Sequence, residues 1–183
     1  MGNGESSYRR FLDGDEKAFD EVINTYRAGL IFFIDQYLQD YHASEDIAID
    51  AFMYLLVHKH RYNFKTSLKT YLYMIGRSKA LNYLKRRKHF QMVDLDIVDG
   101  EVCDSAELEK TLIEDENNRR LHQELKKLPD DIREAIHLVY FESLSYEEAG
   151  KVMKKNRKQI DNLIFRGKKE LKSIFEGEGG FLL

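Results

Sequence analysis

Apolar residues recur at intervals of three and four along most of this chain, which is the spacing of one face of an α-helix. Strands would instead show alternating β-branched residues, and such alternation is rare here. The fold class is therefore predicted to be all-α. The predicted helices cover residues 11–40 with a break near Gly14, 44–57, 67–88, 121–128, 131–141, 145–153 and 156–171.

Several details of these helices follow from the same pattern. Residues 1–10 carry little of it and are expected to be frayed. Ser44 is the expected N-cap of the helix over 44–57, because a serine oxygen can accept a hydrogen bond from the first helical turn. The buried stripe of that helix is predicted to consist of Ile47, Ala51, Tyr54 and Leu55.

The stretch over residues 144–166 predicts two short helices joined by a tight turn. Ser145 followed by Glu148 makes a capping box for the first helix, and Asn156 offers an N-cap to the second. Apolar residues of both helices face inward, whereas amide and cationic residues of the second helix face outward. This layout is that of a helix-turn-helix, whose second helix lies in the major groove of DNA. An ordinary helical hairpin with a solvated basic face is the alternative.

The outward residues of the second helix suit DNA, because Arg, Lys, Asn and Gln read base edges while Lys and Arg neutralise phosphates. The expected DNA contacts of this stretch are Lys155, Arg157, Lys158, Gln159, Asn162, Arg166 and Lys169. The turn departs from the usual pattern, since Lys154 stands where a glycine is common. A positive φ at this lysine costs on the order of 1 kcal/mol, so a locally rebuilt turn is the alternative.

Charge is segregated along the sequence, although the net charge of the 183 residues is only −3. The cationic run Lys85-Arg86-Arg87-Lys88-His89 ends the helix over 67–88 and suits a phosphate backbone. The loop over residues 58–66 mixes aromatic, amide and cationic side chains, as surfaces that stack bases and contact phosphates do. A polar hinge is the equal alternative for this loop.

An acidic stretch separates the two helical halves. In residues 94–118 Lys110 is the only cation, and the early part lacks a clean apolar period. We expect an acidic flexible linker over 90–117 that joins a small helical domain over 1–89 to a second one over 118–183. The linker is interpreted either as a solvated tether or as an acidic strand that avoids DNA and lies in a basic channel of a partner.

Other features narrow the setting and the chemistry. Cys103 is the only cysteine, which excludes an intramolecular disulfide and fits a reducing, cytoplasmic location. The first residues are polar and no apolar run could span a bilayer, so no signal peptide and no membrane insertion are expected. Asp46 and Asp50 have no third ligand nearby, so a solvated helix face is a better interpretation than a metal site. No cofactor is expected.

Taken in order, these segments make the chain resemble the extracytoplasmic-function class of the sigma-70 family, the bacterial RNA polymerase sigma factors. The segments that carry the resemblance are residues 44–52, 64–84 and 128–166, together with the acidic stretch between the last two. Leu144-Ser145-Tyr146-Glu147-Glu148 is its most specific part. Two departures are that Tyr71 stands where this family usually has Trp and that Asn82 stands where Asp is common.

The resemblance implies a protein that binds core RNA polymerase and directs promoter-specific transcription initiation. It implies that the C-terminal domain reads the minus-thirty-five element and that the N-terminal domain recognises the minus-ten element and helps to open the DNA. The residues implied for the minus-ten element and melting are Asn63, Phe64, Lys65, Thr66, Ser67, Tyr71, Arg77, Lys79, Lys85, Arg86 and Arg87. The residues implied for polymerase binding are Asp46, Ile47, Asp50, Ala51 and Phe52.

The implied partners are core RNA polymerase and promoter DNA, and the sequence leaves open whether an anti-sigma factor masks the N-terminal half. Such a protein is not an enzyme, and the sequence shows no nucleophile–base set, phosphate loop or metal cluster. The alternative function is a stand-alone helix-turn-helix transcriptional regulator with an N-terminal dimerisation or ligand domain. That alternative explains the helix-turn-helix, but not the cationic helix end or the basic aromatic loop.

Overall fold

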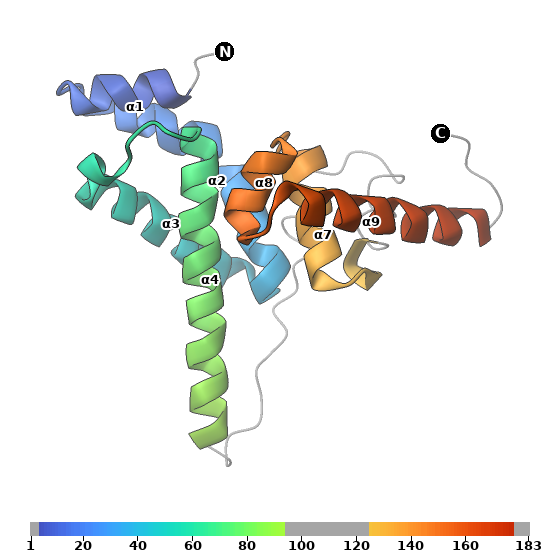
Figure 1. The fold of residues 1–183 in the computed structure, drawn as a ribbon. Coiled ribbons are helices and arrows are strands. Elements are labelled where there is room, and N and C mark those ends of the chain that lie inside the picture. Colours follow the sequence, from blue (N-terminus) through green and yellow to red (C-terminus); the bar gives the residue numbers. More distant parts are fainter. Residues whose placement is uncertain (1–3, 94–124, 178–183) are drawn as a thin grey trace. The chain divides into compact units, whose positions relative to one another are not determined.

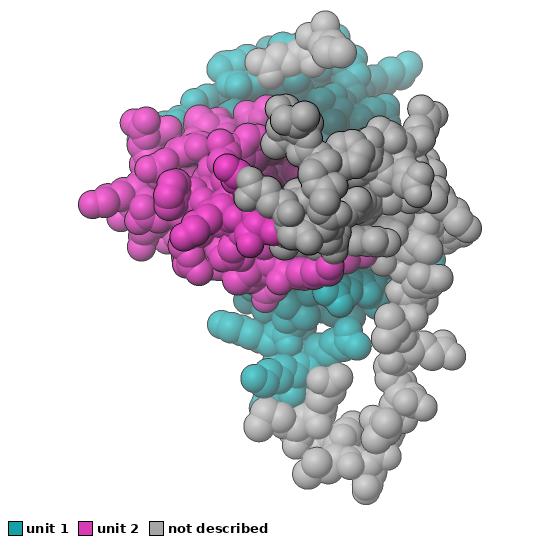
Figure 2. Space-filling model, turned by 90° about the vertical axis from the view of Figure 1, so that its right-hand side faces the viewer, with its two compact units in different colours: residues 1–105 teal, residues 106–183 magenta. Residues whose placement is uncertain are grey.

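The computed structural model describes residues 4–93 and 125–177, and this part of the chain contains helices and turns but no strand (Figure 1). The predicted all-α class is thereby confirmed. Two compact units divide the chain, residues 1–105 and residues 106–183 (Figure 2). They are called unit 1 and unit 2 here.

Unit 1 contains four α-helices and one short 3-10 helix in its described part. They are α1 (Gly4–Leu12), α2 (Lys17–Leu38), α3 (Tyr41–Val57), η1 (Lys59–Arg61) and α4 (Leu68–Val93). Helix α2 packs against both α3 and α4. The largest fully buried apolar side chains of this bundle are Tyr8, Leu30, Phe33, Ile34, Leu55, Leu68, Leu72 and Tyr73. Helix α4 continues past the predicted domain end at residue 89, and the predicted linker lies outside the described residues from residue 94 onward.

Of the residues 1–10 that were expected to be frayed, residues 1–3 lie outside the described part, and for residues 4–10 the expectation is wrong, because α1 forms and is anchored in the core. Tyr8 is fully buried, and its ring lies 5.7 Å from the ring of Phe11 and 6.5 Å from that of Phe19. The predicted break near Gly14 is confirmed, since this glycine adopts φ +105° between α1 and α2. Apolar residues at three-residue spacing, Tyr8 and Phe11, were the signal for this helix.

The predicted N-cap of α3 is also wrong. The helix begins earlier, because the Asp40 carboxylate accepts a hydrogen bond from the Ala43 amide at 3.0 Å and caps the helix. Ser44 is instead buried, and its hydroxyl donates to the Asp40 carbonyl at 2.7 Å and lies 3.1 Å from an Asp35 carboxylate oxygen.

The buried stripe of α3 is rotated from the predicted one. Its buried members are Ser44, Ala48, Ala51, Phe52 and Leu55, whereas Ile47 and Tyr54 are only half-buried. Three of the buried residues are small, which lets α2 approach α3 closely. Sequence hydrophobicity alone favoured the larger side chains and so misplaced the stripe.

Unit 2 contains α7 (Asp130–Ile136), the π-helical turn η2 (His137–Phe141), α8 (Tyr146–Met153) and α9 (Arg157–Gly177) in its described part. Helix α7 packs across α9 at Gly167. A Cβ atom added to this glycine would lie 2.6 Å from Cδ1 of Ile136 and 2.7 Å from Cγ2 of Ile132, so only glycine permits this crossing.

The two predicted caps of the helix-turn-helix are confirmed. The Ser145 amide donates to a Glu148 carboxylate oxygen at 3.0 Å, and the Glu148 amide donates to the Ser145 hydroxyl oxygen at 3.2 Å. Asn156 caps α9 in the same reciprocal way with Gln159, because each side-chain oxygen accepts the other residue's amide at 2.9 and 2.8 Å.

The turn between α8 and α9 forms without glycine. Lys154 adopts φ +56°, so the turn keeps its usual left-handed residue and the alternative of a locally rebuilt turn is wrong. The Lys155 amide donates to the Gly150 carbonyl at 2.9 Å and closes the end of α8. A Cβ atom on Gly150 would lie 2.6 Å from the Lys155 carbonyl oxygen, so this glycine makes room for the turn itself.

Replacing Lys154 by glycine should stabilise unit 2. The left-handed conformation costs roughly 1–2 kcal/mol for a residue with a Cβ atom, which exceeds the roughly 0.4–1 kcal/mol of extra unfolded-state entropy that glycine brings. We expect the denaturant midpoint of the full chain to rise for Lys154→Gly, because the free energy of unfolding increases by about 1 kcal/mol. Lys151→Gly, inside α8, is the control and should lower the midpoint, because it reduces the free energy of unfolding by about 1 kcal/mol. An unchanged or lower midpoint for Lys154→Gly would show that this lysine is not strained.

Candidate nucleic-acid and protein interfaces

The exposed face of α9 presents most of the residues predicted to contact DNA. Ile160, Leu163 and Ile164 are buried on the opposite side of the helix. The exposed members of the predicted set are Arg157, Lys158, Gln159, Asn162, Arg166 and Lys169. Amide and cationic groups therefore share one accessible helix face, which is the arrangement that enters a major groove.

Two members of this set also have roles in the fold. The side-chain oxygen of Gln159 accepts the Asn156 amide, which leaves only the NH2 group of Gln159 for a base. Lys155 is half-buried, and its Nζ atom lies 3.9 Å from a carboxylate oxygen of Asp131 on α7. Arg157 pairs with Glu147 at 3.3 Å, but both side chains are exposed, so this pair is easily exchanged for a phosphate.

Sequence reasoning missed Phe165. Its side chain is 70% exposed, although Ile160, Leu163 and Ile164 of the same helix are buried. Asn162 and Lys169 flank it at helical spacing on the same face. The signal was its position, out of phase with the buried stripe of α9. An apolar side chain on such a face can contact the C5-methyl group of thymine.

The predicted aromatic loop is a compact structure around Tyr62, another residue that sequence reasoning missed. Tyr62 is buried, its hydroxyl donates to the Thr66 carbonyl at 2.7 Å, and its ring lies 4.5 Å from Phe64 and 5.2 Å from Tyr71. The Lys65 amide donates to the side chain of Asn63 at 3.1 Å. The structure thus brings the predicted loop residues together and leaves Asn63 and Lys65 exposed.

The start of α4 completes this cluster. The Ser67 hydroxyl oxygen accepts the Thr70 amide at 3.2 Å and lies 2.7 Å from the Thr70 hydroxyl, so Ser67 caps α4. Because the cap fixes the first turn of α4, it also fixes Tyr71 relative to the loop. Ser67 therefore supports the predicted site because its side chain caps α4.

The predicted cations of α4 fall into two groups. Arg77 and Lys79 are half-buried, whereas Lys85, Arg86 and Arg87 are exposed near the far end of the helix. The Lys79 Nζ atom lies 3.5 Å from an Asp50 carboxylate oxygen and 6.0 Å from the ring centre of Tyr54. Consecutive residues point to different sides of a helix, so the three exposed cations cannot all face one strand.

Only some of the residues predicted to bind polymerase on α3 are accessible, and the others are buried beneath them. Asp46 and Asp50 are exposed and Ile47 is half-buried, whereas Ala51 and Phe52 are buried. Ala51 and Phe52 therefore belong to the core that holds this face in place.

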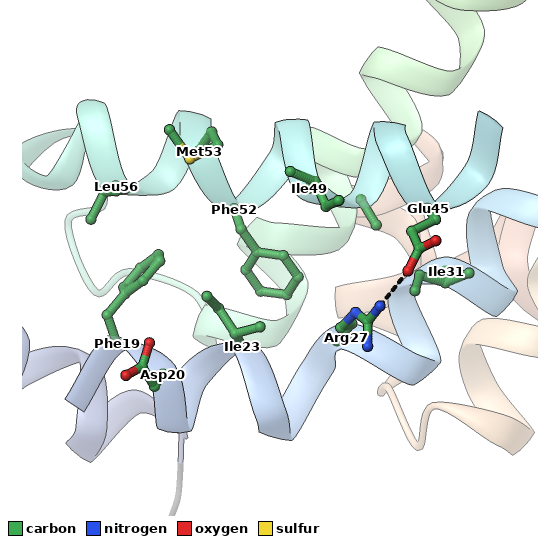
Figure 3. Close-up of a pocket in the computed structure, with 11 residues that line it drawn as sticks. Phe19, Asp20, Ile23, Arg27, Ile31, Glu45, Ile49, Phe52, Met53 and Leu56 are labelled. Carbon is green, nitrogen blue, oxygen red and sulfur yellow. Dashed lines mark hydrogen bonds and ion pairs between the residues drawn. The ribbon is translucent and has the colours of Figure 1, made fainter. Parts of the chain in front are cut away.

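Beside this face lies an apolar groove between α2 and α3, with a volume of about 290 Å3 (Figure 3). Ile49 and Met53 line it from α3, and each is 50% exposed. An ion pair between Arg27 and Glu45 bridges the two helices at one end of the groove. The sequence pattern excludes Met53 from the buried stripe of α3, but sequence reasoning assigned no binding role to Ile49 or Met53. Exposed apolar side chains next to carboxylates are typical of a protein-binding surface.

Two family models match this chain: Sigma-70 region 2 over residues 22–90, and Sigma-70, region 4 over residues 118–171. Similar curated proteins include the ECF RNA polymerase sigma factor SigM of Bacillus subtilis, 26% identical over 85% of this chain and 94% of that protein. The RNA polymerase sigma-H factor of Pseudomonas aeruginosa is 27% identical over 88% of each chain.

Two solved structures share the fold. One is the sigma factor RpoE from Bartonella quintana in complex with the anti-sigma factor NepR, with a TM-score of 0.70 and 20% identity over 87% of this chain and 98% of that chain. The other is CnrH in complex with the cytosolic domain of CnrY, with a TM-score of 0.68 and 18% identity over 97% of this chain and 100% of that chain.

The chain belongs to the extracytoplasmic-function class of the sigma-70 family. It is a sigma factor, which directs RNA polymerase to promoters. A stand-alone regulator is not favoured, because both halves of the chain match sigma regions. Among the described helices, none has the length and apolar character to cross a membrane. The described residues also contain no group of three potential metal ligands.

Phe165→Ala should remove the recognition of one thymine methyl group in the upstream promoter element. Burial of one methyl group contributes about 0.8 kcal/mol, which corresponds to about a fourfold preference. We expect the wild-type holoenzyme to initiate about fourfold less when deoxyuridine replaces that thymine, and the Phe165→Ala holoenzyme to show no such difference. Transcription from promoters with single deoxyuridine substitutions measures this. A methyl preference that survives in Phe165→Ala would show that this side chain does not contact thymine.

Proposed function

We propose that this sigma factor grips a promoter at two elements, with unit 2 reading the minus-thirty-five element and unit 1 capturing the opened minus-ten strand. The observation that carries the proposal is the difference in charge between the described surfaces. Exposed cations and amides outnumber the carboxylates on α9, and cations and amides lie around the aromatic loop, whereas the exposed Asp and Glu residues of α3, Asp46 and Asp50, have no exposed Lys or Arg on the same helix. The domains that perform these tasks are residues 1–89 and 118–183, and residues 90–117 join them.

In unit 2, α9 lies in the major groove of the upstream element. The proposed base contacts are Arg157, Lys158, Asn162 and Arg166, whose donors and acceptors are exposed. Gln159 contributes through its NH2 group alone. The proposed phosphate contacts are Lys155 and Lys169.

In unit 1, the aromatic loop binds a base that has left the duplex. Unstacking costs a few kcal/mol, and stacking on aromatic side chains returns about 1–3 kcal/mol for each base. The residues that form this pocket are Asn63, Phe64, Lys65, Thr66, Ser67 and Tyr71. The cations proposed to hold the strand by its phosphates are Arg77 and Lys79, together with those of Lys85, Arg86 and Arg87 that lie on the same side of α4 as the strand.

Core polymerase binds the acidic face of α3 and the adjoining groove. Asp46 and Asp50 supply the charge and Ile47 lies between them, while Ala51 and Phe52 support this face from the core. The core of a protein interface is apolar and its rim is polar. Ile49 and Met53 with the carboxylates around them fit this description.

The other partners and the setting follow from the same proposal. The acidic linker lies in a basic channel of the polymerase, where its carboxylates take the place of nucleic-acid charge. The two solved structures reported above hold an anti-sigma factor or its counterpart, so an anti-sigma protein is a further proposed partner. The protein acts in the cytoplasm with the polymerase and catalyses no reaction itself.

Arg166→Ala should relax the choice of upstream sequence and leave the minus-ten preference unchanged. Loss of one bidentate base contact costs about 1–3 kcal/mol, or roughly tenfold in discrimination. Selection of promoters from a randomised library by reconstituted holoenzyme measures both preferences. Lys168→Ala is the control, because it removes the same charge from the same helix but its ammonium group lies 5.3 Å from the ring centre of Tyr140. Equal effects of the two variants would argue against base reading by Arg166.

Reversing charge on α3 should prevent assembly with core polymerase. Asp46→Lys and Asp50→Lys each place a cation on the proposed interface, and like charges across an interface cost several kcal/mol. We expect both variants to lose co-purification with core enzyme. Asp13→Lys makes the same charge change at an exposed position between α1 and α2 and should assemble normally. Complexes that survive both α3 substitutions would mean that the polymerase binds elsewhere.

A further inference from the structure

Helix α1 reaches the aromatic loop through Arg9. The guanidinium carbon of Arg9 lies 3.9 Å from the ring centre of Phe64, so the group rests on the face of that ring. The Arg9 side chain is nevertheless 58% exposed, and Glu5 holds it from the previous turn at 3.6 Å. A planar group with one face on a ring and this much exposure turns its other face to solvent.

The neighbouring residue fixes Arg9 relative to the loop. Tyr8 is fully buried, and its hydroxyl lies 3.0 Å from the Lys59 carbonyl and 3.3 Å from the Leu55 carbonyl. Burial raises the pKa of Tyr8 to about 12, so the phenol stays protonated and donates. Its ring meets the ring of Tyr62 edge-on at 5.6 Å. Helix α1 is thus held both to the last turn of α3 and to the start of the loop over residues 58–66.

The loop itself holds a conformation that an isolated chain would avoid. Phe64 adopts φ +59°, which costs roughly 1–2 kcal/mol for a residue with a Cβ atom. Its ring is enclosed by Tyr62 at 4.5 Å and by Arg9. Strained backbone of this kind persists where the surroundings enforce it, and it concentrates at binding sites.

We propose that Arg9 is the outer layer of a base-binding stack made of Tyr62, Phe64 and Arg9. An unpaired base of the opened strand lies on the exposed face of the guanidinium. Proteins stack single-stranded bases on aromatic rings and on arginine planes alike, and the cation strengthens the stack. Asn63 and Lys65, exposed beside Phe64, supply polar contacts to the same nucleotide. This inference rests on the proposed role of the loop in capturing the opened strand.

Arg10 provides an internal comparison on the same helix. It pairs with Glu21 and lies 3.9 Å from an Asp15 carboxylate oxygen, and Glu21 also accepts a hydrogen bond from Ser7 at 2.7 Å. These carboxylates hold Arg10 against α2, away from the loop. The two adjacent arginines therefore differ in surroundings while they share charge, size and helix.

The test combines Arg9 variants with missing bases in the promoter. Holoenzyme is reconstituted with core polymerase, and a promoter that it selects from a randomised library is remade with one abasic site at a time in the opened non-template strand. Open-complex formation is measured for wild type, Arg9→Ala, Arg9→Lys and Arg10→Ala. We expect the wild type to lose on the order of tenfold at the stacked position and Arg9→Ala to show almost no further loss there.

The other variants and positions supply the controls. Arg9→Lys keeps the charge but lacks the plane, so it should behave like Arg9→Ala. Arg10→Ala should show the wild-type abasic profile. An Arg9→Ala profile that matches wild type at every position, even with lower overall activity, would overturn the stack. If no abasic site affects the wild type, the role of the loop itself is wrong, and the two failures are therefore distinguishable.

Discussion

Helices cross in both units where a glycine removes the side chain that would separate them. In unit 1, a Cβ atom on Gly76 of α4 would lie 2.9 Å from Cδ1 of Leu30 on α2. In unit 2, Gly167 of α9 meets Ile132 and Ile136 of α7 in the same way. Each crossing fixes the rotation of a cationic helix about its own axis. The exposed faces of α4 and α9 are therefore decided by packing on their buried faces, and so are the positions of the surfaces proposed to bind DNA.

The surfaces proposed for polymerase and for DNA meet at one ion pair in unit 1. Asp50 belongs to the acidic face of α3, and Lys79 belongs to the cationic helix α4, yet they lie 3.5 Å apart. Both charges are near solvent, so water and salt screen the pair and it contributes little to folding. The position of the pair is what matters, because a group that binds Asp50 also changes the surroundings of Lys79. The surface proposed for polymerase binding therefore adjoins the surface proposed for the opened strand.

The parts of the fold that depend on neighbouring residues could be predicted from the sequence. The capping box of Ser145 and the cap of Asn156 depend on residues within one helical turn, and both were predicted, whereas the sequence left open how the turn at Lys154 is accommodated. Helix α1 was missed because its anchor is distant: Tyr8 bonds to a carbonyl 51 positions along the chain. The cap of α3 was misassigned because Asp40 competes with Ser44 for the same role. Phe165 was missed because residue type alone assigns phenylalanine to a core.

One detail of α9 bears on where its proposed base contacts fall along the DNA. Asn156 and Gln159 seal the first turn of this helix with reciprocal hydrogen bonds, so that turn has fewer free groups to offer. Arg157 and Lys158 are exposed in that first turn, and Asn162 and Phe165 are exposed about one turn further along. A helical turn advances about 5.4 Å, whereas successive nucleotides of a DNA strand are spaced by about 3.4 Å along the axis. Contacts from Asn162 and Phe165 are therefore expected one or two base pairs away from those of Arg157 and Lys158.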